Sequence, residues 1–132
     1  MMKGLSTFDI AGRAMASQLV RMNAIASNLA NAGSISGTEQ GAYRALRPVF
    51  TTRYDGAAAT VDVSTMARTG TPERKLDPHH PLADATGHVW QAAVDPNQEM
   101  VEMVETARAY ANNVEVLSTA RGLALDTLRI GK

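Results

Sequence analysis

The sequence has no cysteine among its 132 residues, which excludes disulfide bonds and thiolate metal sites. It has no excess of charge, because 13 basic residues balance 13 acidic ones, so nothing favours general attraction to nucleic acid or an anionic membrane. It also lacks an apolar run near the roughly 18–20 residues that cross a bilayer, so no membrane insertion is expected. The start of the chain has no apolar segment followed by a cleavage site, so no cleaved secretory signal is expected. Aromatic residues make up only 5%, which favours thin contacts between helices over a thick core.

Patterns typical of catalysis or of a bound cofactor are also missing. His79 and His80 are adjacent in a stretch expected to be extended, where their side chains point apart, and no His-x-x-x-His or cysteine partner accompanies them. Glu99, Glu102 and Glu105 lack the Glu-x-x-His pairs of a di-iron site and instead suit the positive end of a helix. We therefore expect no enzymatic activity, no cofactor and no metal.

Three arginines, Arg44, Arg47 and Arg53, are the best candidates for contacts with phosphate. They belong to a neutral chain, and Glu39 and Asp55 lie nearby in the sequence. We therefore expect solvated or interface positions for these arginines and no nucleic-acid site.

The longest regular pattern runs from Asp95 to Lys132. Asp95 suits a helix N-cap, Pro96 the first helical position and Gly131 the end of the helix. Small or apolar side chains recur at spacings of three and four, as in a heptad seam that needs a partner helix: Met100, Met103, Ala107, Tyr110, Val114, Leu117, Ala124 and Leu128. Roughly 34 residues of helix would be about 50 Å long, more than a compact domain of this size needs.

A second helix is predicted near the start of the chain. Ser6 and Asp9 fit a capping box, with Leu5 and Ile10 placed to form the hydrophobic staple, and Gly33 is suited to end the helix. Heptad spacing is followed by Phe8, Met15, Leu19, Met22, Ala26 and Leu29. Few of these side chains are large, so the helix is expected to be marginal without a partner.

The middle of the chain has the composition of loops and short strands. The patterns predict a loop over 33–41, one or two strands over 43–54 with Pro48 at an edge or bulge, a strand over 60–65, an extended segment over 70–81, and a turn at Thr86-Gly87. The predicted fold is mainly α with a small β insertion. Long terminal helices, within residues 1–32 and 95–132, pair as a coiled coil around a short β-rich segment, 33–94, in one structural unit.

Two segments near the ends carry a family resemblance. The run Arg21-Met22-Asn23-Ala24-Ile25-Ala26-Ser27-Asn28-Leu29-Ala30-Asn31 resembles the N-terminal signature of bacterial flagellar rod and hook axial proteins. The matching C-terminal signature is similar to Asn113-Val114-Glu115-Val116-Leu117 and Thr127-Leu128-Arg129-Ile130-Gly131-Lys132. In addition, His80-Pro81-Leu82-Ala83-Asp84-Ala85-Thr86-Gly87-His88-Val89 is similar to a segment of a proximal-rod member of that family.

The resemblance implies a structural subunit of the periplasmic rod in the flagellar basal body, exported without a cleaved signal peptide. Its implied partners are other flagellar rod proteins and copies of itself, with the export base and the surrounding ring as further candidates. The residues expected in the assembly seam are Met15, Leu19, Met22, Leu29, Met103, Val114, Leu117 and Leu128.

Asn28 and Asn31 leave two interpretations open. They are either cap residues at the end of a helix, or buried amides that penalise wrong helix registers because each must find a partner. The rival function is a cytoplasmic helical oligomerisation module or an export chaperone, which would be a stable dimer in the cytosol. An enzyme would need a cluster of titratable residues that the spacing does not supply.

Overall fold

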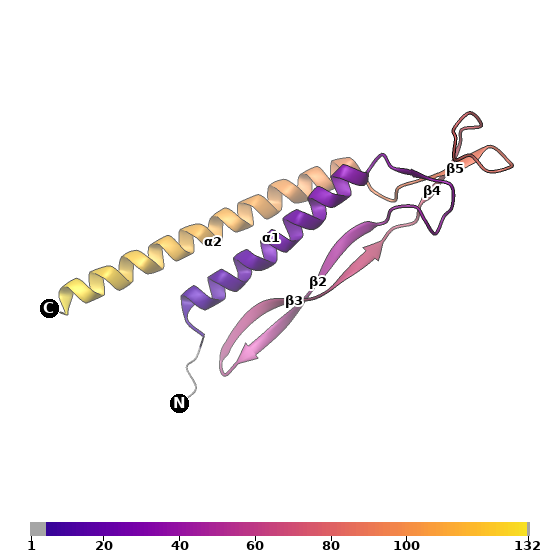
Figure 1. The fold of residues 1–132 in the computed structure, drawn as a ribbon. Coiled ribbons are helices and arrows are strands. Elements are labelled where there is room, and N and C mark those ends of the chain that lie inside the picture. Colours follow the sequence, from indigo (N-terminus) through magenta and orange to yellow (C-terminus); the bar gives the residue numbers. More distant parts are fainter. Residues whose placement is uncertain (1–4, 132) are drawn as a thin grey trace.

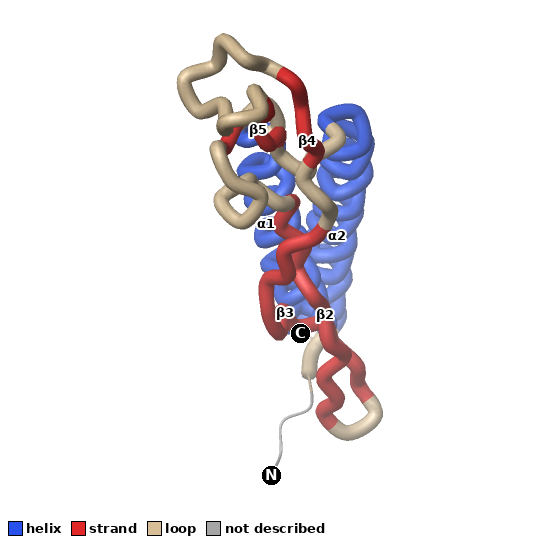
Figure 2. Tube along the Cα trace, turned by 90° about the vertical axis from the view of Figure 1, so that its right-hand side faces the viewer, coloured by secondary structure: helices blue, strands red, loops and turns tan. Residues whose placement is uncertain are grey.

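The structure, a computed structural model, describes residues 5–131 as two long helices with a β-rich segment between them in sequence. Helix α1 (Thr7–Asn31) and helix α2 (Pro96–Ile130) lie side by side and run in opposite directions (Figure 1). A long hairpin packs along α1, and a small sheet lies beyond the ends where α1 finishes and α2 begins (Figures 1 and 2). The predicted mainly α fold with a central β segment is confirmed.

Both helix starts have the predicted caps. The Ser6 hydroxyl accepts a hydrogen bond from the Asp9 backbone N–H at 3.2 Å, and the Asp9 carboxylate accepts one from the Ser6 N–H at 2.9 Å. At α2, the Asp95 carboxylate accepts the backbone N–H of Asn97 at 3.0 Å, with Pro96 in the first turn. These bonds satisfy N–H groups that a helix start leaves without partners.

Helix α2 has 35 residues, which corresponds to about 52 Å at 1.5 Å per residue. Gly131 is its C-cap, as predicted, and the Gly131 N–H donates to the Thr127 carbonyl at 3.1 Å. Lys132, which the sequence pattern places at this end of the helix, lies outside the described residues.

The hairpin consists of strands β2 (Ala45–Asp55) and β3 (Ala58–Thr69), which pair antiparallel along their whole length. Gly56 has a φ of 62° in the connecting turn, a conformation that glycine adopts without steric cost. The register shifts between Val49 and Phe50, directly after Pro48, which confirms the predicted irregularity. The strand predicted over 43–54 is present as β2 with nearly the expected bounds, and the strand predicted over 60–65 is present as the longer β3.

The second sheet has the order β1–β5–β4, with β1 (Ile35–Ser36), β4 (Glu73–Leu76) and β5 (His88–Gln91), all antiparallel. The prediction that 33–41 is only loop was wrong at β1, because Ile35 and Ser36 pair with Gln91 and Trp90, more than 50 residues away. The predicted turn before β5 is present, with Gly87 at a φ of 77°.

The core is thin. Among the described residues, the buried apolar side chains are Ala11, Ala24, Ile25, Ala42, Ala45, Val89 and Ala92. The chain exposes 8921 Å², whereas a compact monomer of 14.1 kDa would expose about 6,700 Å². The shape is therefore elongated and leaves much helix surface without a partner.

Candidate assembly interface

A buried polar cluster joins the two helices to the hairpin, and Asn28 of α1 is at its centre. The Asn28 side chain is 0% exposed. Its Oδ1 accepts the Leu46 backbone N–H at 2.7 Å and the Tyr43 hydroxyl at 2.9 Å. Its Nδ2 donates to the Leu46 carbonyl and to Glu99 Oε2, both at 3.0 Å. The amide thus pairs with both backbone groups of one residue of β2, as a neighbouring strand would, and reaches α2 as well.

Glu99 of α2 brings a charge into this cluster. Its side chain is 1% exposed, and the Arg47 guanidinium of β2 binds both of its carboxylate oxygens. Arg47 Nη1 also donates to Glu102 Oε2 at 2.7 Å. A buried carboxylate is costly unless it is paired and hydrogen-bonded, and here Arg47 and Asn28 supply both.

The sequence interpretation missed this role of Glu99. It assigned Glu99 to the helix dipole, which its position in the first turn of α2 also fits. The charge partner is Arg47, 52 residues away, and no local spacing connects the two. Arg47, for which a solvated or interface position was expected, pairs within the chain with Glu99 and Glu102.

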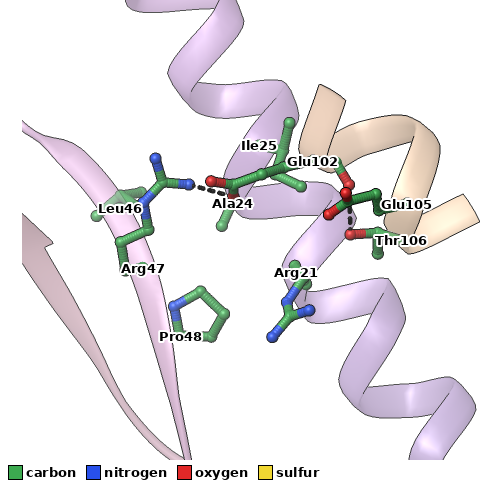
Figure 3. A pocket seen from close by; sticks show the side chains of 9 residues that line it. All are labelled: Arg21, Ala24, Ile25, Leu46, Arg47, Pro48, Glu102, Glu105 and Thr106. Carbon is green, nitrogen blue, oxygen red and sulfur yellow. Dashed lines mark hydrogen bonds and ion pairs between the residues drawn. The ribbon is translucent and has the colours of Figure 1, made fainter. Parts of the chain in front are cut away.

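A cleft of about 320 Å³ lies beside the cluster (Figure 3). It is lined by Arg21, Ala24, Ile25, Leu46, Arg47, Pro48, Glu102, Glu105 and Thr106, which come from α1, β2 and α2. The Arg21 guanidinium lies 4.9 Å from the ring centre of Phe50 on the hairpin, a cation–π contact. Within residues 5–131, no group of three or more His, Cys, Asp or Glu side chains is arranged to hold a metal ion.

None of the four seam residues predicted on α1 is fully buried. Leu19 is 45% exposed, while Met15, Met22 and Leu29 are half-buried. The buried face of α1 is instead made of small and polar residues with one large apolar side chain: Ala11, Ser17, Ala24, Ile25 and Asn28. Small side chains suit this face because α1 contacts both α2 and the hairpin.

On α2, the predicted seam is only partly covered by α1. Met103 and Leu117 are half-buried, but Val114 is 44% and Leu128 67% exposed. The covered face consists of Glu99, Met103, Thr106, Tyr110, Asn113, Leu117 and Ala120. It shares Met103, Tyr110 and Leu117 with the predicted seam. Glu99, Thr106 and Asn113 take the places of Met100, Ala107 and Val114. Val114 and Leu128 are therefore not covered by α1 of the same chain. Their place in contacts between subunits stays a prediction.

The part of α2 beyond Ala120 has no covered side chain. Thr7, at the start of α1, lies across from Ala120 and Leu123, and all residues 121–131 are exposed. The exposed apolar side chains of this end are Leu123, Leu125, Leu128 and Ile130. The helical residues 121–130 correspond to about 15 Å, so this tip projects well past α1.

Asn31 has a different environment from Asn28. It is half-buried, and its Nδ2 donates to the Ser27 carbonyl of the preceding helical turn at 2.9 Å. This bond stays within α1, so the two amides predicted as a pair have separate surroundings.

The loop before β5 is held by Asp84. Its Oδ1 accepts the Thr86 hydroxyl at 2.6 Å and the backbone N–H groups of Thr86 and His88 at 2.8 and 3.0 Å. These bonds lower the pKa of Asp84 to about 2, and the bond from the Thr86 hydroxyl has the largest effect. The positive charge of Arg74 also contributes to the lowering. The role is structural, and it accounts for one acidic residue of the segment that resembles a rod protein.

Two segments of the chain match known protein families. Residues 8–33 match the family described as flagella basal body rod protein, and residues 85–130 match the C-terminal region of the flagellar basal body rod FlgEFG proteins. Together these matches cover most of α1, β5 and α2.

Whole-length relatives are found among proteins named flagellar basal-body rod protein FlgC. The Salmonella typhimurium protein is 42% identical over 131 residues, covering 97% of this chain and 98% of the relative. The Yersinia enterocolitica protein is 41% identical over the same length, and the Aquifex aeolicus protein is 32% identical over 124 residues, covering 92% of both chains. Neither α1 nor α2, as described, is both long and apolar enough to cross a membrane.

Proposed function

Because the chain belongs to the family of flagellar basal-body rod proteins named FlgC, we propose that it is a subunit of the proximal rod, joined to its neighbours through its terminal helices. It is a structural component of the basal-body rod. Its partners are other rod proteins and further copies of itself, with the export base and the surrounding ring as additional neighbours. It has no enzymatic role.

The observation that carries this proposal is the helix surface that one chain leaves uncovered. The exposed area of 8921 Å² exceeds that of a compact monomer by about 2,200 Å². One side of a standard protein interface buries about 800 Å². The excess is therefore enough for more than two neighbours, as a subunit inside a shaft would have.

The terminal helices form the inner layer of the proposed subunit. We propose that the pair is a coiled coil, since the covered residues of α2 recur at spacings of three and four. In this proposal residues 1–32 and 95–132 form the axial core, and residues 33–94 form the outer layer towards other rod proteins. Asn28 sets the register of the helix pair, because a shift of α2 would remove its bond to Glu99, while its bonds to Leu46 and Tyr43 hold α1 in place on the segment that begins the hairpin. Asn31, the last residue of α1, supports the end of the helix through its bond to the Ser27 carbonyl.

The thin core supports coupled folding and assembly. Apart from Ile25 and Val89, the buried apolar side chains of the described residues are alanines. We propose that the chain is exported unfolded into the periplasm, without cleavage of a signal peptide, and becomes fully ordered as neighbours cover its helices.

Purification of basal bodies tests the proposed role. The protein should be present in them and absent from the soluble cytosolic pool. Leu29→Asp and Leu117→Asp should block incorporation into the rod while leaving export intact, because a charge enters a half-buried helix contact. Asn23→Asp and Asn112→Asp place the same charge at exposed positions of the same helices and should be incorporated normally. A stable cytosolic dimer, with normal motility in both leucine variants, would favour the oligomerisation module or chaperone.

A further inference from the structure

Each helix carries a second stripe that its own chain does not cover. The α1 stripe consists of Phe8, Gly12, Met15, Leu19, Met22 and Ala26. The α2 stripe consists of Met100, Val104, Ala107, Ala111, Val114, Ser118 and Leu125. Successive members are separated by alternating steps of four and three residues, apart from the last step of the α2 stripe, so each stripe follows one face of its helix.

Both stripes are accessible in the single chain. Phe8 and Leu19 are each 45% exposed on α1, and only Met15 and Met22 of that stripe are half-buried. Every member of the α2 stripe is exposed, with Met100 at 59% and Val104 at 52%. This stripe lies on another face of α2 than the residues that meet α1, so the intramolecular helix pair leaves it free.

We propose that the α1 stripe of one copy docks on the α2 stripe of the next copy in the rod, an inference that rests on the rod role proposed above. Neither stripe contains a charged residue, so the two surfaces match in polarity. They also match in shape, because bulky Phe8 and Leu19 of one stripe can insert beside Ala107 or Ala111 of the other. The contact joins different surfaces of identical chains, so it repeats from copy to copy without closing on itself.

The area of this contact explains why it needs many copies. The α1 stripe covers about 27 Å of helix, and a helix about 10 Å wide then contributes roughly 300 Å² per contact. A stable pair buries about 800 Å² on each side. A copy with a neighbour on each side uses both of its stripes and buries about 600 Å² in total. A series of copies is therefore more stable than an isolated pair.

The absence of cysteine allows a clean cross-linking test. Leu19→Cys is combined in one chain with a cysteine at Val104, Ala111 or Ser118, three positions that scan the axial offset between copies. Each variant is the only copy in a motile strain, and its purified basal bodies are treated with a mild oxidant. A disulfide forms only where two Cα atoms approach within about 7 Å. The control pairs Leu19→Cys with Asn112→Cys, which is exposed but lies off the α2 stripe.

At least one stripe pair should give a ladder of dimers, trimers and larger species on a non-reducing gel. The control pair and each single variant should stay monomeric. The proposal is overturned if Leu19→Cys alone gives dimers, if the adduct has the mass of another rod protein, or if no stripe pair cross-links in motile cells. If Leu19→Cys abolishes motility, Ala26→Cys with Ala107→Cys provides the same test with minimal change in side-chain size. Absence of the protein from basal bodies would instead contradict the proposed function.

Discussion

Replacing Asn28 by alanine should destabilise the folded chain far more than the same change at Asn31. Asn28→Ala removes four hydrogen bonds, including both that satisfy the backbone of Leu46. Asn31→Ala removes the side-chain bond to the Ser27 carbonyl, in a half-buried setting. Both positions are helical, so the gain in helix propensity from alanine is about the same and cancels in the comparison.

The magnitude follows from the groups left without partners. In Asn28→Ala, Tyr43 keeps its bond to Ser27, and Glu99 keeps Arg47. The Leu46 N–H and carbonyl, however, lose the Asn28 amide that pairs with both of them, at a cost of about 1–3 kcal/mol for each group left without a partner. We expect a loss of about 3–4 kcal/mol, against about 0.5–1 kcal/mol for the single bond of Asn31. The difference of at least about 2 kcal/mol is roughly a 30-fold change in the folding equilibrium.

The assay must work even if the chain is largely unfolded by itself. Trimethylamine N-oxide favours compact states because it is excluded from protein surface. Titration with this osmolyte, followed by ellipticity at 222 nm, therefore measures a folding free energy in conditions where the native state is rare in plain buffer. The shift in midpoint, relative to the unmodified chain, gives the cost of each substitution. Equal shifts for Asn28→Ala and Asn31→Ala, within about 0.5 kcal/mol, would refute the bonding network as the stabilising centre, because such a network exceeds a single helix bond in cost.

Four further predictions concern other parts of the chain. Glu99→Gln should lower the free energy of unfolding by about 1.5–3 kcal/mol in the same titration, because Arg47 loses its buried charge partner but keeps Glu102. The control Glu105→Gln, at an exposed position, should cost under about 0.5 kcal/mol. Equal costs would contradict the buried pair. Carboxyl NMR should give Asp84 a pKa of about 2 in place of 3.8, so its hold on the loop is complete above about pH 4 and is lost as the pH falls towards 2; a midpoint near 3.8 would contradict these bonds. Gly122→Ala should raise helix stability by about 1 kcal/mol, since a Cβ there meets no atom within 4 Å, and no gain in helix content would count against an open tip. Circular dichroism of the dilute monomer should show fewer helical residues than the 25 of α1 plus the 35 of α2; full helix content would argue against coupled folding.

Local signals predicted the helices and strands well, because caps and turns depend on a few neighbouring residues. Asp95-Pro96, Gly131 and the Ser6–Asp9 capping box all lie where the sequence pattern put them. Pro48 also predicted an irregular strand, since it lacks the N–H of a regular ladder. Strand β1 was missed because it is only two residues long and depends on a distant partner strand.

The face on which each helix packs could not be predicted in the same way. The sequence interpretation chose the stripes with the largest apolar side chains, such as Leu19 and Val114, as the seam. Within one chain the contact is instead made by polar or small residues, such as Thr106, Asn113 and Ala24. A heptad pattern shows that a helix face can pack, but it does not say whether the partner belongs to the same chain or to another.

Gly122 gives the free tip of α2 a mechanical property of its own. It stands within the helix, two residues past Ala120, where α1 no longer supports α2. Glycine makes a helix easier to bend, and no side chain packs against this position, so bending here disturbs no packing. The polar cluster around Glu99 lies near the opposite end of α2, separated from such a bend by about 32 Å of helix that α1 supports. The end of α2 beyond Ala120 can therefore bend to fit neighbouring subunits of different shape, while the rest of the subunit keeps its conformation.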